Sequence, residues 1–245
     1  MFSWKKVGDR EYLAAKVKSC EASMSEADHP EPILFGFGGK DFFSLEEAEE
    51  MNKVLGCSKV FSLDQVHGTD IACATRVDSS SAVSVSKSAD GWEIEVSKFS
   101  TSGALFALKT ADCLPIIIQA STHIYLLHAG WRGLRDGIIG EALMRIRERK
   151  GVISRVWIGP AADPKLYEVG GEFVEYFEPS TLAPSTTSGK YLFNAYTEAL
   201  RQFQDHPSDI FTSPHFTMSD DRFSSYRISG KAAGRNISFV AFPSS

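Results

Sequence analysis

Short apolar runs separated by polar turns recur along most of the chain, and this pattern predicts a protein rich in β-strands. The clearest run is Ile116-Ile117-Ile118, whose three β-branched residues are apolar on both faces of a strand. Such a strand is typical of a sheet that is covered on both sides. The predicted strands are one within residues 4–17 and others at 33–39, 59–63, 71–74, 92–96, 104–108, 115–119, 123–128, 155–159, 209–212 and 236–242.

Apolar residues at helical spacing predict two longer helices, at residues 44–55 and 136–150. Ser44 and Glu47 have the spacing of a capping box for the first of these helices. Shorter helices are predicted at 171–177 and 194–203, and loops at 19–32, 77–88, 160–169 and 179–190. The chain shows no internal repeat and no long linker, so we expect a single mixed α/β domain over residues 1–245.

The candidate chemistry is concentrated in residues 109–133, KTADCLPIIIQASTHIYLLHAGWRG. Cys113 follows one predicted strand, and His128 ends another strand just before a glycine-rich turn and a helix start. Polar residues at strand ends beside such turns commonly build sites in α/β proteins. His67 lies at another boundary between strand and loop, and a lone histidine there is more often a hydrogen-bonded loop residue than a metal ligand.

Composition narrows the class of protein. The 245 residues are 43% hydrophobic and 23% charged, which is ordinary for a globular domain, and the net charge of −5 argues against general affinity for nucleic acid or an anionic membrane. No apolar run approaches the ~20 residues of a membrane span, and the first residues do not have the pattern of a signal peptide. Four cysteines without a CxxC pair suggest a reducing, cytoplasmic location.

Cys113, His67 and His128 together suit two mechanisms. A thiolate and two imidazoles are good zinc ligands, and three protein ligands leave a fourth position for water. Alternatively, Cys113 is a nucleophile whose pKa is lowered by a histidine, or it is merely buried. Arg132 follows the glycine-rich turn, where it either binds phosphate through its guanidinium or forms a surface salt bridge.

Three separated blocks, DQVHGTDI, TADCLPIII and HAGWRGL, resemble the signature blocks of the YfiH/laccase-domain family, also described as multicopper polyphenol oxidoreductases and purine nucleoside phosphorylases. The resemblance continues through IGPAADPKLYEVGGEF and FSSYRISGKAAGR, and so covers most of the chain after residue 60. It implies a single α/β domain with mixed sheets layered between helices, similar to the catalytic domain of a bacterial cytotoxic deamidase.

The resemblance also implies zinc bound by His67, Cys113 and His128, with copper as the less favoured metal. The implied reaction is phosphorolysis of adenosine, inosine and methylthioadenosine, with adenosine deamination in some members, so the expected partners are a purine nucleoside and phosphate. Three alternatives stay open: a zinc or cysteine amidase acting on a cell-wall precursor, a copper polyphenol oxidase (laccase), and a non-catalytic zinc-binding protein.

Further residues take roles from their places in these blocks. Arg132 and Arg227 are expected to neutralise phosphate. Asp112 is either a catalytic acid or base or a carboxylate that orients a histidine, and we favour the second role. Gln65 either binds substrate or caps a turn. The N-terminal segment ILFGFGGKDFFSLEEAEE lacks the arginine and the asparagine usual in the family, which predicts altered contacts to the substrate.

Overall fold

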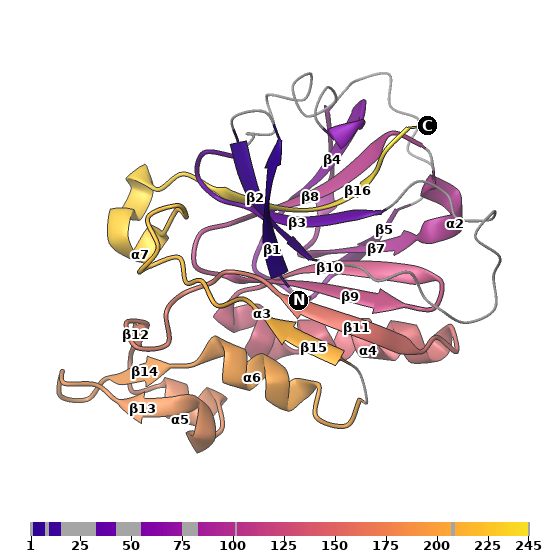
Figure 1. Ribbon diagram of the computed structural model, residues 1–245. Helices are drawn as coiled ribbons and strands as arrows, with labels where there is room; N and C mark the ends of the chain where they lie inside the picture. The colour runs from indigo at the N-terminus through magenta and orange to yellow at the C-terminus, as the bar shows by residue number, and fades with distance from the viewer. Residues whose placement is uncertain are drawn as a thin grey trace.

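The computed structural model describes residues 2–7, 10–15, 33–42, 55–74, 83–100, 102–206 and 209–244. These residues form two large mixed β-sheets and one small sheet, with α-helices beneath the second large sheet (Figure 1). The first sheet has the spatial order β1 (Phe2–Val7), β2 (Arg10–Ala15), β3 (Leu34–Gly38), β16 (Asn236–Phe242), β8 (Ala104–Thr110), β4 (Lys59–Asp64) and β6 (Val83–Ser88). The second has the order β15 (Asp209–Thr212), β11 (Ile153–Ile158), β9 (Leu114–Ala120), β10 (His123–Ala129), β7 (Gly91–Glu95) and β5 (Ile71–Cys73).

The remaining elements lie mostly in the second half of the chain (Figure 1). The small antiparallel sheet has the order β12 (Glu168–Val169), β14 (Tyr191–Phe193) and β13 (Leu182–Pro184). The helices are α2 (Val96–Phe99), α3 (Trp131–Asp136), α4 (Ile138–Glu148), α5 (Phe173–Tyr176), α6 (Ala195–Gln202) and α7 (Tyr226–Ser229), with 3₁₀ turns η2 (Pro179–Thr181) and η3 (Gly230–Ala232). None of the described helices is both long enough and apolar enough to cross a membrane.

The core is layered, with the two large sheets packed face to face. One buried cluster joins Phe35 of the first sheet to Ile117 and Trp157 of the second, and the Phe35 and Trp157 rings lie 5.2 Å apart. Ile116 and Ile118 belong to a different buried cluster, which includes residues of α4 and α6. The alternation of these isoleucines between the two clusters confirms that β9 is covered on both faces, and each buried side chain contributes about 1.5–3 kcal/mol.

The structure confirms the mixed α/β class and most predicted strands, but several elements differ from the prediction. The strand predicted within 4–17 is the pair β1 and β2, and the loops predicted at 160–169 and 179–190 contain β12 and β13. Residues 83–88, predicted as loop, form β6, which pairs in parallel with β4 at the edge of the first sheet. The helix predicted at 136–150 is α4, and a separate short helix, α3, precedes it, because Gly137 adopts a left-handed conformation (φ +95°) that ends α3 and begins α4. The helix predicted at 44–55 lies outside the described residues except for Leu55, and a single domain over residues 1–245 stays a prediction.

Glu93 of β7 supports a prediction about acid stability. Its carboxylate is buried and accepts hydrogen bonds from Tyr125, Arg145 and Arg149. Burial alone raises the pKa of Glu93, but Arg149 and the other donors outweigh burial and lower this pKa from 4.5 to about 2. The stabilisation is therefore complete above pH 4.5 and is lost as the pH falls towards 2.

We expect Glu93→Gln to lower the free energy of unfolding at pH 7 by about 3 kcal/mol and to flatten its dependence on pH below 4.5. Urea unfolding of the wild type and the variant at several pH values measures both effects. Glu148→Gln, at an exposed position on α4, is the matched control and should leave the curve unchanged. If the free energy of unfolding depended on pH in the same way in the wild type and in Glu93→Gln, Glu93 would not be a source of the acid sensitivity.

Candidate metal centre and active-site cavity

Three strand connections bring the predicted ligands together. Cys113 lies where the chain passes from β8 in the first sheet to β9 in the second. His128, the penultimate residue of β10, pairs with Pro115 of β9 and so lies beside Cys113. β4 runs parallel to β8, so the loop that follows β4 carries His67 to the same end of the sheets.

The side chains of His67, Cys113 and His128 form one cluster. The ligand atoms that they offer all lie within 4.8 Å of one another, and the two imidazole rings have centroids 4.9 Å apart. Gly130 makes this approach possible, because a Cβ at that position would lie 3.1 Å from the Cys113 sulfur and 3.2 Å from His67 Cδ2. The structure therefore brings together three residues that lie far apart in the sequence.

Asp90, which the sequence analysis did not single out, organises this cluster. Its side chain is fully buried directly before β7, and its oxygens accept the backbone N–H groups of Val66, His67 and Gly68 at 3.2, 2.9 and 2.6 Å. The same carboxylate lies 2.8 Å from His128 Nδ1. These three N–H bonds fix the loop in which His67 adopts a positive φ of 62°. One carboxylate thus positions both histidines.

The charges around Cys113 form a coupled set. Burial raises the pKa of Cys113, but His128 and His67 outweigh it and bring this pKa down to about 6. Burial lowers the pKa of His128, whereas the Cys113 thiolate and Asp90 raise it to about 9. For Asp90, burial is outweighed by His128 and by the backbone donors, so its pKa is lowered. At neutral pH, without a metal, Cys113 and His128 form a thiolate–imidazolium pair.

This donor set fits a transition metal. The bond to Asp90 occupies His128 Nδ1 and leaves Nε2 as the free ring nitrogen, an arrangement that is typical of metal-binding histidines. One thiolate and two imidazoles suit zinc or copper and leave room for a further ligand. A metal needs the thiolate and the neutral imidazole, so its binding would release the proton that His128 carries in the thiolate–imidazolium pair.

The cluster opens into a cavity of about 770 Å³, and every predicted site residue lines it. The predicted residues are Gln65, His67, Asp112, Cys113, His128, Arg132 and Arg227. The wall also contains residues that the sequence analysis did not select, namely Leu63, Asp64, Lys109, Ala111, Trp131, Tyr167, Tyr226 and Arg235. Cations and aromatic rings therefore surround the metal-binding cluster.

Arg132 and Arg227 are held differently in this wall. The exposed Arg132 guanidinium lies 4.3 Å from the centre of the Trp131 ring. Arg227 lies 4.6 Å from the centre of the Tyr167 ring and donates a 2.7 Å hydrogen bond to the carbonyl of Glu168. Stacking leaves guanidinium N–H groups free at the ring edge, so both arginines can bind an anion that enters the cavity.

The structure corrects the favoured role of Asp112. The carboxylate that orients a histidine is Asp90, whereas Asp112 is buried and accepts the Thr217 hydroxyl at 2.6 Å and the Arg227 backbone N–H at 2.7 Å. Asp112 therefore anchors the start of α7, which carries Arg227 into the cavity. The orienting role was favoured because carboxylates that orient histidines are common, but both Asp112 oxygens are engaged by Thr217 and Arg227.

The side chain of Gln65 forms hydrogen bonds with the backbone of Lys109. Its side-chain amide donates to the Lys109 carbonyl and accepts the Lys109 N–H, both at 2.8 Å. This pair of bonds ties the loop after β4 to the end of β8, so it fixes the distance between His67 and Cys113. Of the two roles left open for Gln65, the contacts favour the structural one.

Comparisons with known proteins identify relatives that are named as enzymes. A purine nucleoside phosphorylase of Pseudomonas aeruginosa is 34% identical over 241 residues, which cover 92% of this chain and 93% of the relative. The purine nucleoside phosphorylase YfiH of Escherichia coli is 34% identical over 191 residues, covering 75% of this chain and 74% of the relative. The prediction that the chain is an enzyme is thereby confirmed.

Solved structures share the fold. The YfiH protein of Bacillus licheniformis superposes with a TM-score of 0.72 at 20% identity, over 85% of this chain and 92% of that one. YlmD of Geobacillus stearothermophilus gives a TM-score of 0.71 at 22% identity and covers 98% of both chains. The profile of the multi-copper polyphenol oxidoreductase laccase family matches residues 45–243. The chain belongs to this family, the YfiH/laccase-domain family.

Proposed function

We propose that this protein is a cytoplasmic, zinc-dependent purine nucleoside phosphorylase that acts on adenosine, inosine and methylthioadenosine and also deaminates adenosine. One observation carries the proposal: the His67–Cys113–His128 cluster lies in the same cavity as Arg132 and Arg227. The names of the relatives in Pseudomonas aeruginosa and Escherichia coli support the reaction. Cys57, Cys73 and Cys113 are free thiols, which suits the reducing cytoplasm.

The metal and the residues of the cavity have separate tasks in this reaction. When bound by the three ligands, zinc supplies a Lewis acid that polarises a substrate oxygen. Arg132 and Arg227 bind phosphate, which attacks C1′ of the sugar while the C1′–N bond to the purine breaks. Tyr226, whose ring is half-exposed at the cavity wall, offers an aromatic face for the purine. The cavity volume of about 770 Å³ accommodates a nucleoside and phosphate together.

A nucleoside panel tests the reaction. Adenosine, inosine and methylthioadenosine are incubated with the enzyme with and without phosphate, and free base, sugar phosphate and ammonia are measured. Base release that requires phosphate supports phosphorolysis, and ammonia from adenosine supports deamination. Equal base release without phosphate, or no reaction on any nucleoside, would reject the phosphorylase.

Arg132 supports a prediction about phosphate binding. We expect Arg132→Gln to raise the KM for phosphate about 10- to 100-fold, because a charge-assisted bond to the anion is lost, with a smaller change in kcat. Initial rates at varied phosphate and saturating nucleoside measure this effect. Arg147→Gln, at an exposed position on α4, is the control and should behave like the wild type. An unchanged KM for phosphate in Arg132→Gln would remove Arg132 from the phosphate site.

The Cys113 thiolate favours a second candidate function. A cysteine with a pKa of about 6 beside a buried histidine is also the arrangement of a thiol hydrolase. An amidase would attack an amide carbonyl with the Cys113 sulfur and would need no metal. Cleavage of an aminoacyl-sugar substrate by metal-free enzyme, without activity on nucleosides, would select this alternative.

A further inference from the structure

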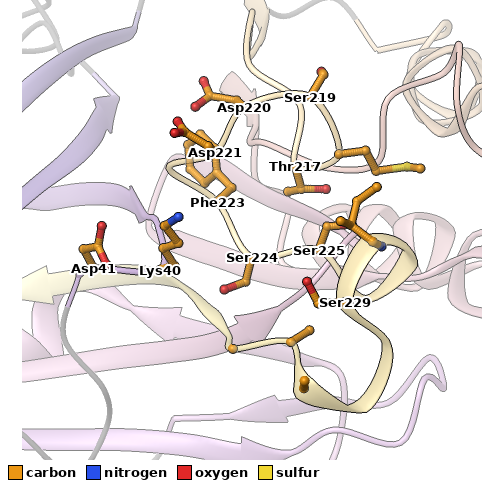
Figure 2. A pocket seen from close by; sticks show the side chains of 15 residues that line it. Lys40, Asp41, Thr217, Ser219, Asp220, Asp221, Phe223, Ser224, Ser225 and Ser229 are labelled. Atoms are coloured by element: carbon orange, nitrogen blue, oxygen red, sulfur yellow. The ribbon is translucent and has the colours of Figure 1, made fainter.

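A second cavity lies beside α7 and has no part in the proposed reaction. We call it the α7 cavity; its volume is about 560 Å³. The two cavities use different residues of one short helix: Tyr226 and Arg227 line the metal-centre cavity, whereas Ile228 and Ser229 line the α7 cavity. Figure 2 shows Lys40 and Asp41 on one side of the α7 cavity, Ser225 and Ser229 on the other, and Ser224 between them.

Ser224 gives this cavity a fixed hydroxyl that lacks a protein partner. The residue is 7% exposed, and its backbone is held by Asn236, which accepts the Ser224 N–H and donates to the Ser224 carbonyl, both at 2.8 Å. Among the described residues, no hydrogen bond engages Ser224 Oγ. The Ser224 hydroxyl is accessible from the cavity, so it is available to bond to a ligand there.

Other free groups around the cavity both donate and accept hydrogen bonds. Within the described residues, the Lys40 ammonium and the carboxylates of Asp41 and Asp221 have no hydrogen bond or ion pair from their side chains. Asp220 is different, because Arg222 pairs with its carboxylate at 2.6 Å. Ser225 Oγ accepts the Ile228 N–H, so its own proton is available to a ligand.

The charges decide the class of ligand. The Asp41 and Asp221 carboxylates disfavour an anion, while Lys40, the donating hydroxyls and the Arg222 charge that acts on Asp221 disfavour a cation. A sugar hydroxyl both donates and accepts, so a polyhydroxyl compound can bond to serine, lysine and aspartate at once. Met218, Phe223 and Ile228 add apolar walls that suit the carbon face of a sugar ring.

We propose that the α7 cavity is a second small-molecule site that takes a neutral polyhydroxyl compound about the size of a monosaccharide. The proposal rests on the unpartnered Ser224 hydroxyl and on the free donors and acceptors around it. It does not depend on the reaction at the metal centre.

The site adjoins the metal-centre cavity through one residue. Thr217 lines the α7 cavity and donates its hydroxyl to Asp112, whose other oxygen accepts the Arg227 N–H. A ligand in the α7 cavity therefore contacts the segment that positions Arg227. An effect of the ligand on catalysis would travel through this bond or along α7, and its size would equal the difference in ligand affinity between two positions of the segment.

The test titrates the metal-loaded protein with neutral, anionic and cationic probes and records backbone amide NMR shifts. The probes are D-ribose, D-glucose, ribose 5-phosphate and putrescine. We expect a neutral sugar to bind saturably, with a Kd in the millimolar range, and to shift the amides of Lys40, Ser224 and Ser229. No shift at these amides with either sugar at about 100 mM, or shifts with a charged probe alone, would overturn the proposal.

Two variants locate the binding. Ser224→Ala should weaken sugar binding about tenfold, because one hydrogen bond to the ligand is lost, whereas Ser97→Ala on exposed α2 should not change it. If the amide spectrum of Ser224→Ala shows that it is unfolded, Asp221→Ala at the exposed rim takes its place and should weaken binding several-fold. Unchanged sugar affinity in the folded variant would place the sugar elsewhere and reject the site.

Discussion

Replacement of Cys113 by serine should remove both the metal and the activity. The wild-type protein, purified without chelator, should carry close to one zinc per chain, and the serine variant less than about a tenth of that amount, because a neutral hydroxyl is a poor zinc ligand. Cys113→Asp should retain part of both, since a carboxylate oxygen binds zinc. Elemental analysis and the nucleoside assay measure the two effects on the same samples.

The control for this series is Cys73→Ser, which changes an exposed thiol outside the cluster and should leave metal content unchanged. A nucleophilic Cys113 gives a different pattern: both variants keep the fold, lack turnover and form no adduct, while substrate labels the wild-type sulfur. A covalent Cys113 adduct in active, metal-free enzyme, detected by mass spectrometry, would reject the ligand role. Stoichiometric copper in place of zinc would support the polyphenol oxidase.

The strands of this fold could be predicted from sequence because the apolar positions of each strand match the faces that the structure buries. Ile116 to Ile118 are apolar on both faces, and the structure buries both faces. The separate short helix α3 could not be predicted from periodicity, because the apolar positions continue from it into α4 and the break between them depends on the backbone of Gly137 alone. β6 has a serine-rich sequence that resembles a loop, and only its pairing with β4 makes it a strand.

The site could be predicted as a set of residues but not as a network. His67, Cys113 and His128 each end or follow a strand, which is a local signal. The histidine partner Asp90 lies in an Asp-Gly pair after a serine-rich segment, where the sequence indicates an ordinary turn. Its importance comes from the antiparallel pairing of β7 with β10, which places the start of β7 beside His128. The contact between Asp90 and His128 depends on which strands are neighbours in the sheet, and a local sequence pattern does not specify this order.

The Asp90 carboxylate contacts both histidines of the cluster, so its replacement should affect metal binding and stability together. Its Oδ1 accepts the His67 N–H and faces His128 Nδ1, and its Oδ2 accepts the N–H groups of Val66 and Gly68. In Asp90→Asn, one of these oxygens becomes an NH₂ group. If the amide nitrogen takes the place of Oδ1, it donates to His128 Nδ1 and moves the imidazole proton to the nitrogen needed for the metal. If it takes the place of Oδ2, it meets two N–H donors in a buried site.

We therefore expect Asp90→Asn to lower metal affinity about 10- to 100-fold and to destabilise the fold by about 1–3 kcal/mol, with a larger loss of stability in Asp90→Ala. Competition with a chromophoric chelator measures the affinity, and thermal unfolding of the metal-free protein measures the stability separately. Asp70→Asn, an exposed carboxylate three residues after His67, is the matched control and should change neither quantity. Because both orientations of the asparagine amide lose a contact, wild-type metal affinity together with wild-type stability in Asp90→Asn would show that another group positions the histidines.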